Sequence, residues 1–216
     1  MEKFFVVDIP EIDCYVKIYK GLLDEDRLKR LYQLSKKSCV KRYPITVFNR
    51  ETIQPRTNCV FGDTNLLGSY VNYSTAEIEL TDWPSEMKEL CDDISTPNFS
   101  PDMCLVNGYI ELTDMVGAHR DKELQDKYNT VCTVSLGGTR RFIFRPHKPH
   151  KLIPENIEIE LEHGDVLYMF GNTNIYFTHE IAKYRKTKDR FEFAPRYSLT
   201  FREQQGGKAF PESKKR

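Results

Sequence analysis

The sequence predicts a mainly β protein of the α+β class, with a sandwich or jelly roll as its core. After residue 101 the chain consists of short apolar or alternating runs separated by turn residues, whereas helical periodicity occurs in two stretches before it. The 216 residues suffice for one well-packed unit. We therefore expect an N-terminal part over 1–100 that belongs to the same compact unit, a β core over 101–203 and a polar, basic tail over 204–216.

Two helices are predicted in the N-terminal part. The stretch from Asp24 to about Ser38 places Leu28 and Leu31 at helical spacing, with acidic residues at its first turn, where the helix dipole favours them. A second helix opens at Trp83-Pro84-Ser85 and runs toward Cys91, because proline suits a first helical turn whose N–H groups have no partner. Between the two helices, residues 47–50 are typical of a strand that leads into a turn.

Eight strands are predicted in the core, each a short run rich in β-branched and aromatic residues. They are Cys104–Ile110, Met115–Asp121, Thr130–Leu136, Arg140–Arg145, Ile157–Leu161, Val166–Phe170, Ile175–Ile181 and Arg196–Arg202. Turns such as Gly137-Gly138 and Gly171-Asn172 separate them. Eight short strands with few helices favour a sandwich or jelly roll, but the fold alone does not identify a reaction.

Composition indicates an intracellular protein. The chain has 39% hydrophobic and 30% charged residues, and no run approaches the ~18 apolar residues of a membrane span. The apolar start of the chain is too short for a secretory signal. Six scattered cysteines without a CxxC pair are expected to be free thiols. We expect a monomer in the nucleus or cytoplasm, not secreted and without a membrane partner. The balance of 32 basic and 32 acidic residues neither suggests nor excludes nucleic acid.

The histidines suggest a metal site. His119 and Asp121 are one residue apart on a predicted strand, so both side chains point to the same face. His179, in a distant apolar run, is the candidate third ligand. Two imidazoles and one carboxylate leave three positions open, as in non-haem Fe(II) oxygenases, where 2-oxoglutarate takes two and dioxygen the third. The alternative is a chance His-x-Asp with hydrogen-bonded histidines, and spacing alone leaves both open. His147 and His150 lie in a loop without a thiolate or carboxylate partner.

A row of polar side chains suggests an anion site. One face of a predicted strand carries Arg196, Ser198, Thr200 and Arg202. Two guanidiniums on a core strand are costly unless an anion is bound, and arginine is suited to bidentate capture of a carboxylate. A dicarboxylate that also chelates iron fits this requirement. The alternative is an exposed edge strand with outward polar residues. Asn107 and Tyr109 alternate on another strand and are placed to reach the same ligand.

Several segments resemble the AlkB family of Fe(II)- and 2-oxoglutarate-dependent dioxygenases, and most closely its eukaryotic members that act on DNA. The segments, in the family's order and over about half the chain, are Cys104–Tyr109, Val116–Glu123, Val134–Gly137 with Arg141–Phe144, Leu161–Met169 and Pro195–Arg202. They resemble its Asn-x-Tyr strand, its His-x-Asp-x-Glu signature, the next hairpin, the turn before the distal histidine and the closing Arg-x-Asn-x-Thr-Phe-Arg strand. The resemblance implies a double-stranded β-helix (jelly-roll) core with N-terminal helices and a nucleotide-recognition lid.

The resemblance also implies roles for the matching residues. The iron ligands, and with them the catalytic centre, are expected to be His119, Asp121 and His179. The cosubstrate residues are expected to be Asn107, Tyr109, Arg196, Thr200 and Arg202. Arg196 would pair with the distal carboxylate of 2-oxoglutarate, whereas Arg202 would lie nearer the metal. The chain departs from the family pattern twice. Ser198 stands where the family usually has asparagine, and the segment between His179 and Arg196 is several residues longer.

Substrate contacts follow from a looser likeness of the N-terminal part to the lid. The expected substrate-binding residues are Val47, Phe48, Asn49, Phe61, Tyr73 and Glu123. Phe48 resembles the wedge of a finger hairpin that opens duplex DNA, Tyr73 would stack on the flipped base, and Glu123 would face it. For Phe48 and Tyr73 the alternative is ordinary packing. The basic residues of the lengthened segment, which otherwise form a solvated face, are candidates for contacts to the nucleic-acid backbone: Arg185, Lys186, Lys188 and Arg190.

The function implied by the resemblance is DNA alkylation repair. An enzyme of this kind uses Fe(II), 2-oxoglutarate and O2 to hydroxylate the methyl group of 1-methyladenine or 3-methylcytosine, with decarboxylation of 2-oxoglutarate and release of formaldehyde. Its partner is alkylated DNA. Three alternatives remain: a demethylase of RNA or single strands, a 2-oxoglutarate oxygenase acting on protein or small molecules, and a non-catalytic nucleic-acid-binding module on the same scaffold.

Overall fold

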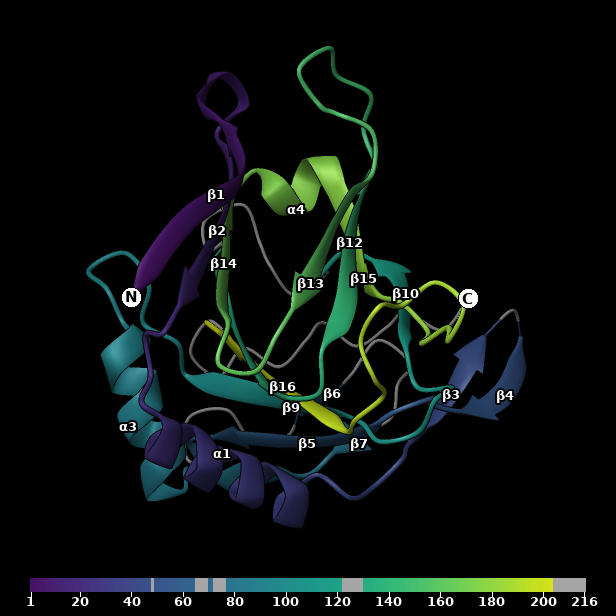
Figure 1. The fold of residues 1–216 in the computed structure, drawn as a ribbon. Helices are drawn as coiled ribbons and strands as arrows, with labels where there is room; N and C mark the ends of the chain where they lie inside the picture. The colour runs from purple at the N-terminus through teal and green to yellow at the C-terminus, as the bar shows by residue number, and fades with distance from the viewer. Residues whose placement is uncertain (48, 65–69, 72–76, 122–129, 204–216) are drawn as a thin grey trace.

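Two mainly antiparallel sheets face each other and form the core of the molecule (Figure 1). The computed structural model describes residues 1–47, 49–64, 70–71, 77–121 and 130–203. The large sheet has the order β1-β2-β14-β11-β16-β9-β5-β8, and the small sheet has the order β10-β15-β12-β13. The predicted mainly β jelly roll is confirmed.

All eight predicted core strands are present. They are β9 (Met103–Tyr109), β10 (Val116–His119), β11 (Val131–Gly137), β12 (Arg140–Pro146), β13 (Ile157–Leu161), β14 (Val166–Gly171), β15 (Phe177–Ile181) and β16 (Arg196–Arg202). Two predicted bounds were wrong. The strand predicted from Ile175 begins only at Phe177, because the short helix α4 (Thr173–Tyr176) precedes it. The strand predicted to reach Asp121 ends at His119.

Residues of the N-terminal part extend the large sheet at both ends. At one end, β1 (Glu2–Ile9), the 3-10 turn η1 (Pro10–Ile12) and β2 (Cys14–Lys20) form a hairpin that pairs with β14. At the other end, β5 (Thr57–Gly62) pairs with β9, and β8 (Leu80–Asp82) pairs with β5. The sequence analysis did not predict the β1–β2 hairpin, although alternate residues of β2 are buried as in any half-covered strand.

Two short hairpins lie outside the core sheets. The first joins β3 (Pro44–Val47) to β4 (Arg50–Ile53), and its turn includes Asn49 with a φ of 60°. At the predicted strand and turn over 47–50, β3 ends at Val47, Asn49 lies in the turn and β4 begins at Arg50, whereas Phe48 lies outside the described residues. The second pairs β6 (Tyr70–Val71) with β7 (Glu77–Ile78).

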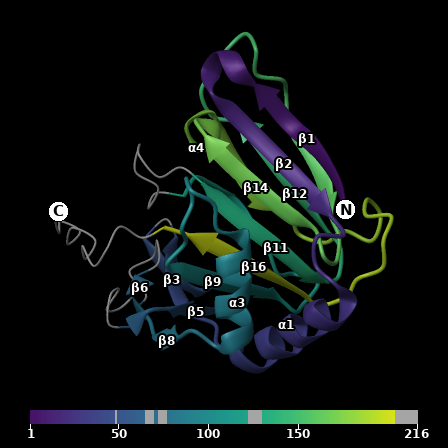
Figure 2. The same ribbon diagram turned by 90° about the vertical axis from the view of Figure 1, so that its left-hand side faces the viewer.

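Two helices cover the outer face of the large sheet, as Figures 1 and 2 show from two sides. They are α1 (Glu25–Ser38), whose N-cap Asp24 accepts a hydrogen bond from the backbone N–H of Arg27, and α3 (Ser85–Ile94). Both predicted helices are confirmed. Their apolar sides share a buried cluster with the odd-numbered side chains of β16. The even-numbered, polar side chains of β16 therefore face the space between the two sheets.

The cysteines agree with the expectation from the sequence. All six cysteines are free thiols. In the described part of the chain, no helix has the length and apolar character needed to cross a membrane.

A buried ion pair fastens the β3–β4 hairpin to the core. Asp114, which is 1% exposed in the turn between β9 and β10, accepts hydrogen bonds from the backbone N–H groups of Ile110 and Glu111. Its two oxygens also accept from the guanidinium of Arg42, just before β3, at 2.8 and 2.9 Å. Burial alone would raise the pKa of Asp114, but these donors lower it. The pair therefore anchors the base of the hairpin.

Replacing Asp114 by alanine should destabilise the protein by about 3 kcal/mol, because the partly buried Arg42 loses its bidentate partner and two backbone N–H groups lose their acceptor. Urea unfolding followed by circular dichroism measures this change. The matched control is Asp92→Ala in the exposed pair with Lys88, which should shift stability by less than about 0.5 kcal/mol. Equal effects of the two substitutions would show that the buried pair is no anchor.

Candidate metal centre

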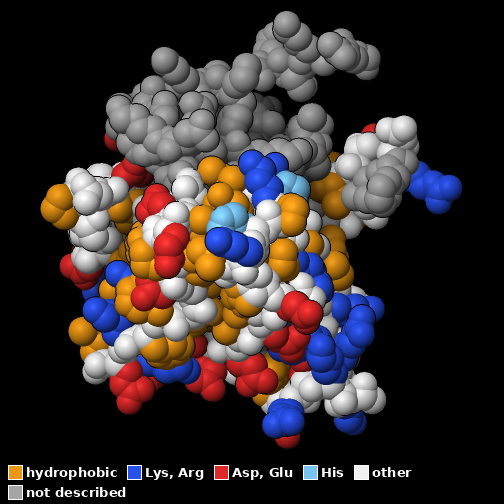
Figure 3. Space-filling model, turned by 90° about the horizontal axis from the view of Figure 1, so that it is seen from above, with side chains coloured by type: hydrophobic (Ala, Val, Ile, Leu, Met, Phe, Trp, Pro, Cys, Tyr) orange, Lys and Arg blue, Asp and Glu red, His pale blue; other side chains and the backbone are white. Residues whose placement is uncertain are grey.

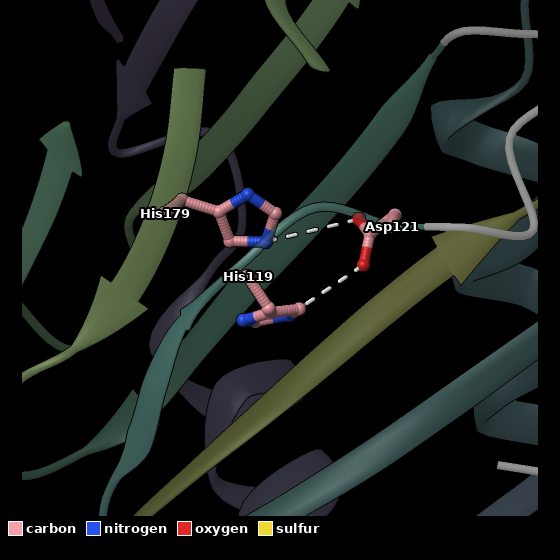
Figure 4. Close-up of side chains that lie close together, drawn as sticks. All are labelled: His119, Asp121 and His179. Atoms are coloured by element: carbon pink, nitrogen blue, oxygen red, sulfur yellow. Dashed lines mark ion pairs between the residues drawn. The ribbon is translucent and has the colours of Figure 1, made fainter. Parts of the chain in front are cut away.

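Two neighbouring side chains, His119 and Asp121, converge between the sheets with His179, which is far from them in the sequence. His119 at the end of β10 lies opposite His179 of β15 in the strand pairing, and their ring centroids are 4.4 Å apart. Asp121 lies two residues beyond His119. One ligand atom from each of the three residues lies within 4.8 Å of the others. Figure 4 shows the two rings and the carboxylate pointing toward one another. The spacing in the sequence left a shared metal site as one of two possibilities. The structure brings the three side chains together as that site requires.

The loop that carries Asp121 is held by α4. Because β10 ends at His119, the strand ladder does not position the carboxylate. Instead, the side chain of Asn174 bonds the backbone of Asp121 twice: its oxygen accepts from the N–H at 2.9 Å, and its nitrogen donates to the carbonyl at 2.8 Å. Sequence reasoning missed Asn174, because its neighbours in sequence carry no signal for this contact.

Both imidazoles turn the same nitrogen toward Asp121. Nδ1 of His119 donates to the carbonyl of Gly117 at 2.9 Å, which leaves the lone pair on Nε2. That Nε2 is 3.6 Å from one oxygen of Asp121, and Nε2 of His179 is 3.8 Å from the other. The ring of His179 stacks on Phe142 with an interplanar angle of 6°. These contacts fix the ring orientations that a shared metal ion requires.

The charges at the site suit metal binding. Burial would raise the pKa of Asp121, but the charge of Arg202 and the two nearby imidazoles outweigh it and hold that pKa well below its usual range. Arg202 also donates a hydrogen bond to Asp121 at 2.9 Å. Burial lowers the pKa of His179 to about 3, although Asp121 opposes the shift. At neutral pH the carboxylate is therefore ionised and His179 is neutral, as metal ligands must be. Two nitrogens and one oxygen are the donor set that non-haem Fe(II) prefers.

A cavity of about 630 Å³ adjoins the three side chains. Of the predicted cosubstrate residues, Asn107, Tyr109, Thr200 and Arg202 line this cavity. Arg196 lies beyond its wall, with its guanidinium 5.5 Å above the ring of Tyr109. Thr46 of β3 and Ile78 of β7 also line the cavity, so its wall extends onto both outer hairpins.

Two further residues hold Asn107 in place. Its side-chain oxygen accepts a hydrogen bond from Arg56 Nε at 3.0 Å and another from Asn58 Nδ2 at 2.6 Å. Because the oxygen is occupied, the amide nitrogen is the group that Asn107 offers to a ligand. Sequence reasoning missed both donors. Asn58 lies opposite Asn107 because β5 pairs with β9, and the sequence does not show which strands pair.

Most predicted substrate contacts lie outside the described residues. This holds for Phe48, Tyr73 and Glu123 and for the side chain of Val47. Asn49 is exposed in the turn after β3. The structure corrects the expectation that Phe61 binds the substrate. Phe61 is 2% exposed and packs in the core cluster with the helices, so it does not form part of the cavity wall.

The basic segment after β15 is exposed but anchored. Arg185, Lys186, Lys188 and Arg190 are all exposed. Between them, buried Asp189 accepts hydrogen bonds from the side chain of Arg141 on β12 and from the backbone N–H of Arg185. The segment is thus fixed to the small sheet with its basic side chains outward.

Comparisons with known proteins identify the family. The 2OG-Fe(II) oxygenase superfamily matches residues 15–202. This chain belongs to that superfamily. Two solved structures share the fold of this oxygenase. The structure of OsALKBH1 has a TM-score of 0.59 and 19% identity, covering 87% of this chain and 97% of that one. A 2OG-Fe(II) oxygenase family oxidoreductase from Burkholderia pseudomallei has a TM-score of 0.57 and 13% identity, covering 89% and 86%.

Curated relatives of the oxygenase are AlkB proteins. DNA oxidative demethylase ALKBH2 of Bos taurus is 29% identical over 170 residues, which cover 73% of this chain and 56% of that protein. The human protein of the same name is 28% identical over 168 residues, covering 73% and 60%. Alpha-ketoglutarate-dependent dioxygenase AlkB of Escherichia coli is 32% identical over 124 residues, covering 56% and 55%. The chain spans little more than half the length of these relatives. The predicted membership of the oxygenases that use Fe(II), 2-oxoglutarate and O2 is confirmed, and the curated relatives named above are AlkB proteins.

Replacing His119 by alanine should weaken binding of Fe(II), or of Co(II) as its spectroscopic substitute, by at least about 100-fold, since one of three ligands is lost. Metal titration under anaerobic conditions measures the affinity, and circular dichroism checks the fold. Asn174→Ala should lower the metal affinity by about 10- to 100-fold, because it removes support from Asp121 without removing a ligand.

The matched control is His147→Ala, which removes an exposed histidine outside the group and should leave metal affinity unchanged. Undiminished metal binding by the His119 variant would contradict the assignment of this site.

Proposed function

We propose that this chain is an oxidative demethylase of N-alkylated bases in DNA, of the 1-methyladenine and 3-methylcytosine kind, which acts in alkylation repair inside the cell. One observation carries the proposal. The three metal-binding side chains adjoin a cavity whose wall continues from the core onto β3 and β7, in the part of the chain that resembles a nucleotide-recognition lid. The names of the AlkB relatives support the same reaction class.

In this proposal His119, Asp121 and His179 hold the iron. When bound, the iron supplies the activation of dioxygen at the expense of 2-oxoglutarate. Arg202 keeps the carboxylate of Asp121 ionised, and Asn174 holds its backbone. Apolar side chains of the cavity, such as those of Val131, Phe142, Leu167 and Met169, limit the water near the reacting methyl group.

The cosubstrate lies along the inner face of β16. Arg202 is at the metal end of this face and Arg196 at the other, with Ser198 and Thr200 between them. Arg196 is fully buried, and its Nε and Nη1 have no hydrogen-bond partner among the described residues. A dicarboxylate chelating the metal at one end would place its other carboxylate near this guanidinium. Asn107, Tyr109 and Thr200 complete the proposed contacts.

A nucleic-acid base is the proposed occupant of the outer cavity. Cavities of about 300–1,000 Å³ hold ligands of drug size, so about 630 Å³ accommodates a base beside the cosubstrate. A base in a duplex must leave the stack to enter such a site, which is the role we propose for Phe48 with Val47 and Asn49. Phe48, Tyr73 and Glu123 remain in the proposal on the sequence resemblance.

The anchored basic segment is the proposed contact to the DNA backbone. On the face seen in Figure 3, lysine and arginine side chains gather toward the right, the side on which Figure 1 shows the small sheet. Arg185, Lys186, Lys188 and Arg190 extend from this sheet, and the buried Arg141–Asp189 pair holds their backbone. Fixed cations of this kind bind phosphates through charge and release of counterions.

The decisive assay measures formaldehyde and succinate released from oligonucleotides that carry 1-methyladenine or 3-methylcytosine, in duplex and single-stranded form. We expect both products in equal amounts, dependent on Fe(II) and 2-oxoglutarate and abolished by His119→Ala. Methylated RNA and a methylated peptide serve as competing substrates. Succinate release with formaldehyde from RNA or peptide only would contradict the proposed substrate.

The same assay at rising salt tests the basic segment. The double substitution Arg185→Ala with Lys186→Ala should reduce the salt dependence of duplex binding by about two counterions and leave turnover at saturating DNA unchanged. The double substitution Lys36→Ala with Lys37→Ala on α1 is the control. Identical salt dependence in all three proteins would remove the segment from the DNA interface.

A further inference from the structure

Two buried arginines from opposite sheets meet at the turn between β11 and β12. Arg196 begins β16 and pairs with Gly137, the last residue of β11. Arg140 begins β12 only three residues further along the chain. Arg196 is 0% exposed and Arg140 is 1% exposed. Arg140 lies on the same side of β12 as Phe142, which lines the cavity, so its side chain faces the space between the sheets.

No carboxylate of the described chain lies within ion-pair distance of these two guanidiniums. The buried acidic residues are Asp114, Asp121, Asp165 and Asp189. Each of them already has a cationic partner, in the same order Arg42, Arg202, Lys20 and Arg141. Within the described ranges, neither Arg140 nor Arg196 forms an ion pair. Two buried charges without a direct ion-pair partner are unfavourable unless an anion binds near them.

Four nitrogen atoms of the pair have no hydrogen-bond partner among the described residues. They are Nε and Nη2 of Arg140 and Nε and Nη1 of Arg196. The remaining contacts are few: Arg140 Nη1 donates to the carbonyl of Thr139 at 3.0 Å, and Arg196 Nη2 donates to the hydroxyl of Ser135 at 2.8 Å. Buried N–H groups are nearly always satisfied in folded proteins. Four unused donors in one place therefore indicate a missing acceptor.

Tyr109 connects the pair to the cavity. The guanidinium of Arg196 lies 5.5 Å above its ring, and the ring itself lines the cavity beside the metal-binding side chains. Burial raises the pKa of the Tyr109 phenol, while the charges of Arg196 and Arg140 lower it. Burial lowers the pKa of Arg196 to about 10, and the charge of Arg140 contributes to that shift.

Ser198 offers the anion little on the side of β16. It lies on the same inner face as Arg196, and its short hydroxyl has a single O–H donor. Arg140 begins β12 in the facing sheet.

We propose that Arg140 is a second anion-binding residue of the cosubstrate site, which together with Arg196 holds the distal carboxylate of 2-oxoglutarate. This inference rests on the proposed use of 2-oxoglutarate. A carboxylate accepts up to about four hydrogen bonds, so it can accept one from each of the four nitrogen atoms that lack a partner. The site therefore selects a dicarboxylate over a 2-oxo acid that ends in a methyl group.

The test is calorimetric titration of 2-oxoglutarate into protein loaded with Mn(II) without oxygen, which measures binding and not turnover. Arg140→Met should weaken 2-oxoglutarate binding by at least about tenfold, because a charge-assisted hydrogen bond is lost. The affinity of Arg140→Lys for 2-oxoglutarate should fall between those of Arg140→Met and the wild type, because lysine keeps the charge. Arg145→Met is the matched control, since it is on the same strand but pairs with Glu180 on the outer face, and it should bind normally. 2-Oxopentanoate, which has no distal carboxylate, should bind all four proteins equally weakly.

Several outcomes overturn the proposal. Normal binding of 2-oxoglutarate by Arg140→Met would do so, as would an equal loss of affinity for 2-oxoglutarate and 2-oxopentanoate. The second result would assign Arg140 to stability alone, through its stacking on Phe193 at 4.6 Å. If Arg140→Met does not fold, the order of affinities among wild type, Arg140→Lys and Arg140→Gln decides in the same way. Failure of the wild type to bind 2-oxoglutarate would refute the proposed function itself.

Discussion

The structure depends on a carboxylate that is buried where water cannot stabilise it. Asp121 is 1% exposed, and burial of an ionised carboxylate is strongly unfavourable unless cations or donors surround it. Arg202 and the two imidazoles supply this compensation, and they come from β16, β10 and β15. One ion pair thus joins β16, in the middle of the large sheet, to the loop that follows β10 of the small sheet. A metal ion bound by the same group would add to this compensation.

The alternation of β16 explains why one strand serves both stability and chemistry. Its odd-numbered side chains, Tyr197, Leu199 and Phe201, pack under the helices in the main core. Its even-numbered side chains face the second sheet, where they meet the cavity and the buried arginines. A shift of register by one residue would bury the charges under the helices and expose the apolar row. The helices α1 and α3 therefore fix the orientation of the cosubstrate face as well as covering the sheet.

Features with a regular period were predictable from the sequence, whereas contacts across the fold were not. The two-residue period of a strand predicted that His119 and Asp121 share a face. It also separated the polar and apolar faces of β16. It wrongly extended the strand to Asp121, because the position of that residue depends on Asn174 of α4. The β1–β2 hairpin was missed, although buried and half-buried residues alternate along most of β2. Phe61 was assigned to the substrate because a motif does not say which face of β5 it occupies. The burial of Arg140 could not be predicted, since burial of a charged residue at this position depends on the opposite sheet.

The central claim is that this site presents one iron ion with two adjacent positions open to 2-oxoglutarate. The most direct measurement is the visible absorption spectrum of the Fe(II)-loaded protein as 2-oxoglutarate is added in the absence of oxygen. Chelation through the 2-oxo and carboxylate oxygens should give a charge-transfer band that saturates at one equivalent of cosubstrate per protein. Iron that binds to the protein but never produces this band would contradict the account.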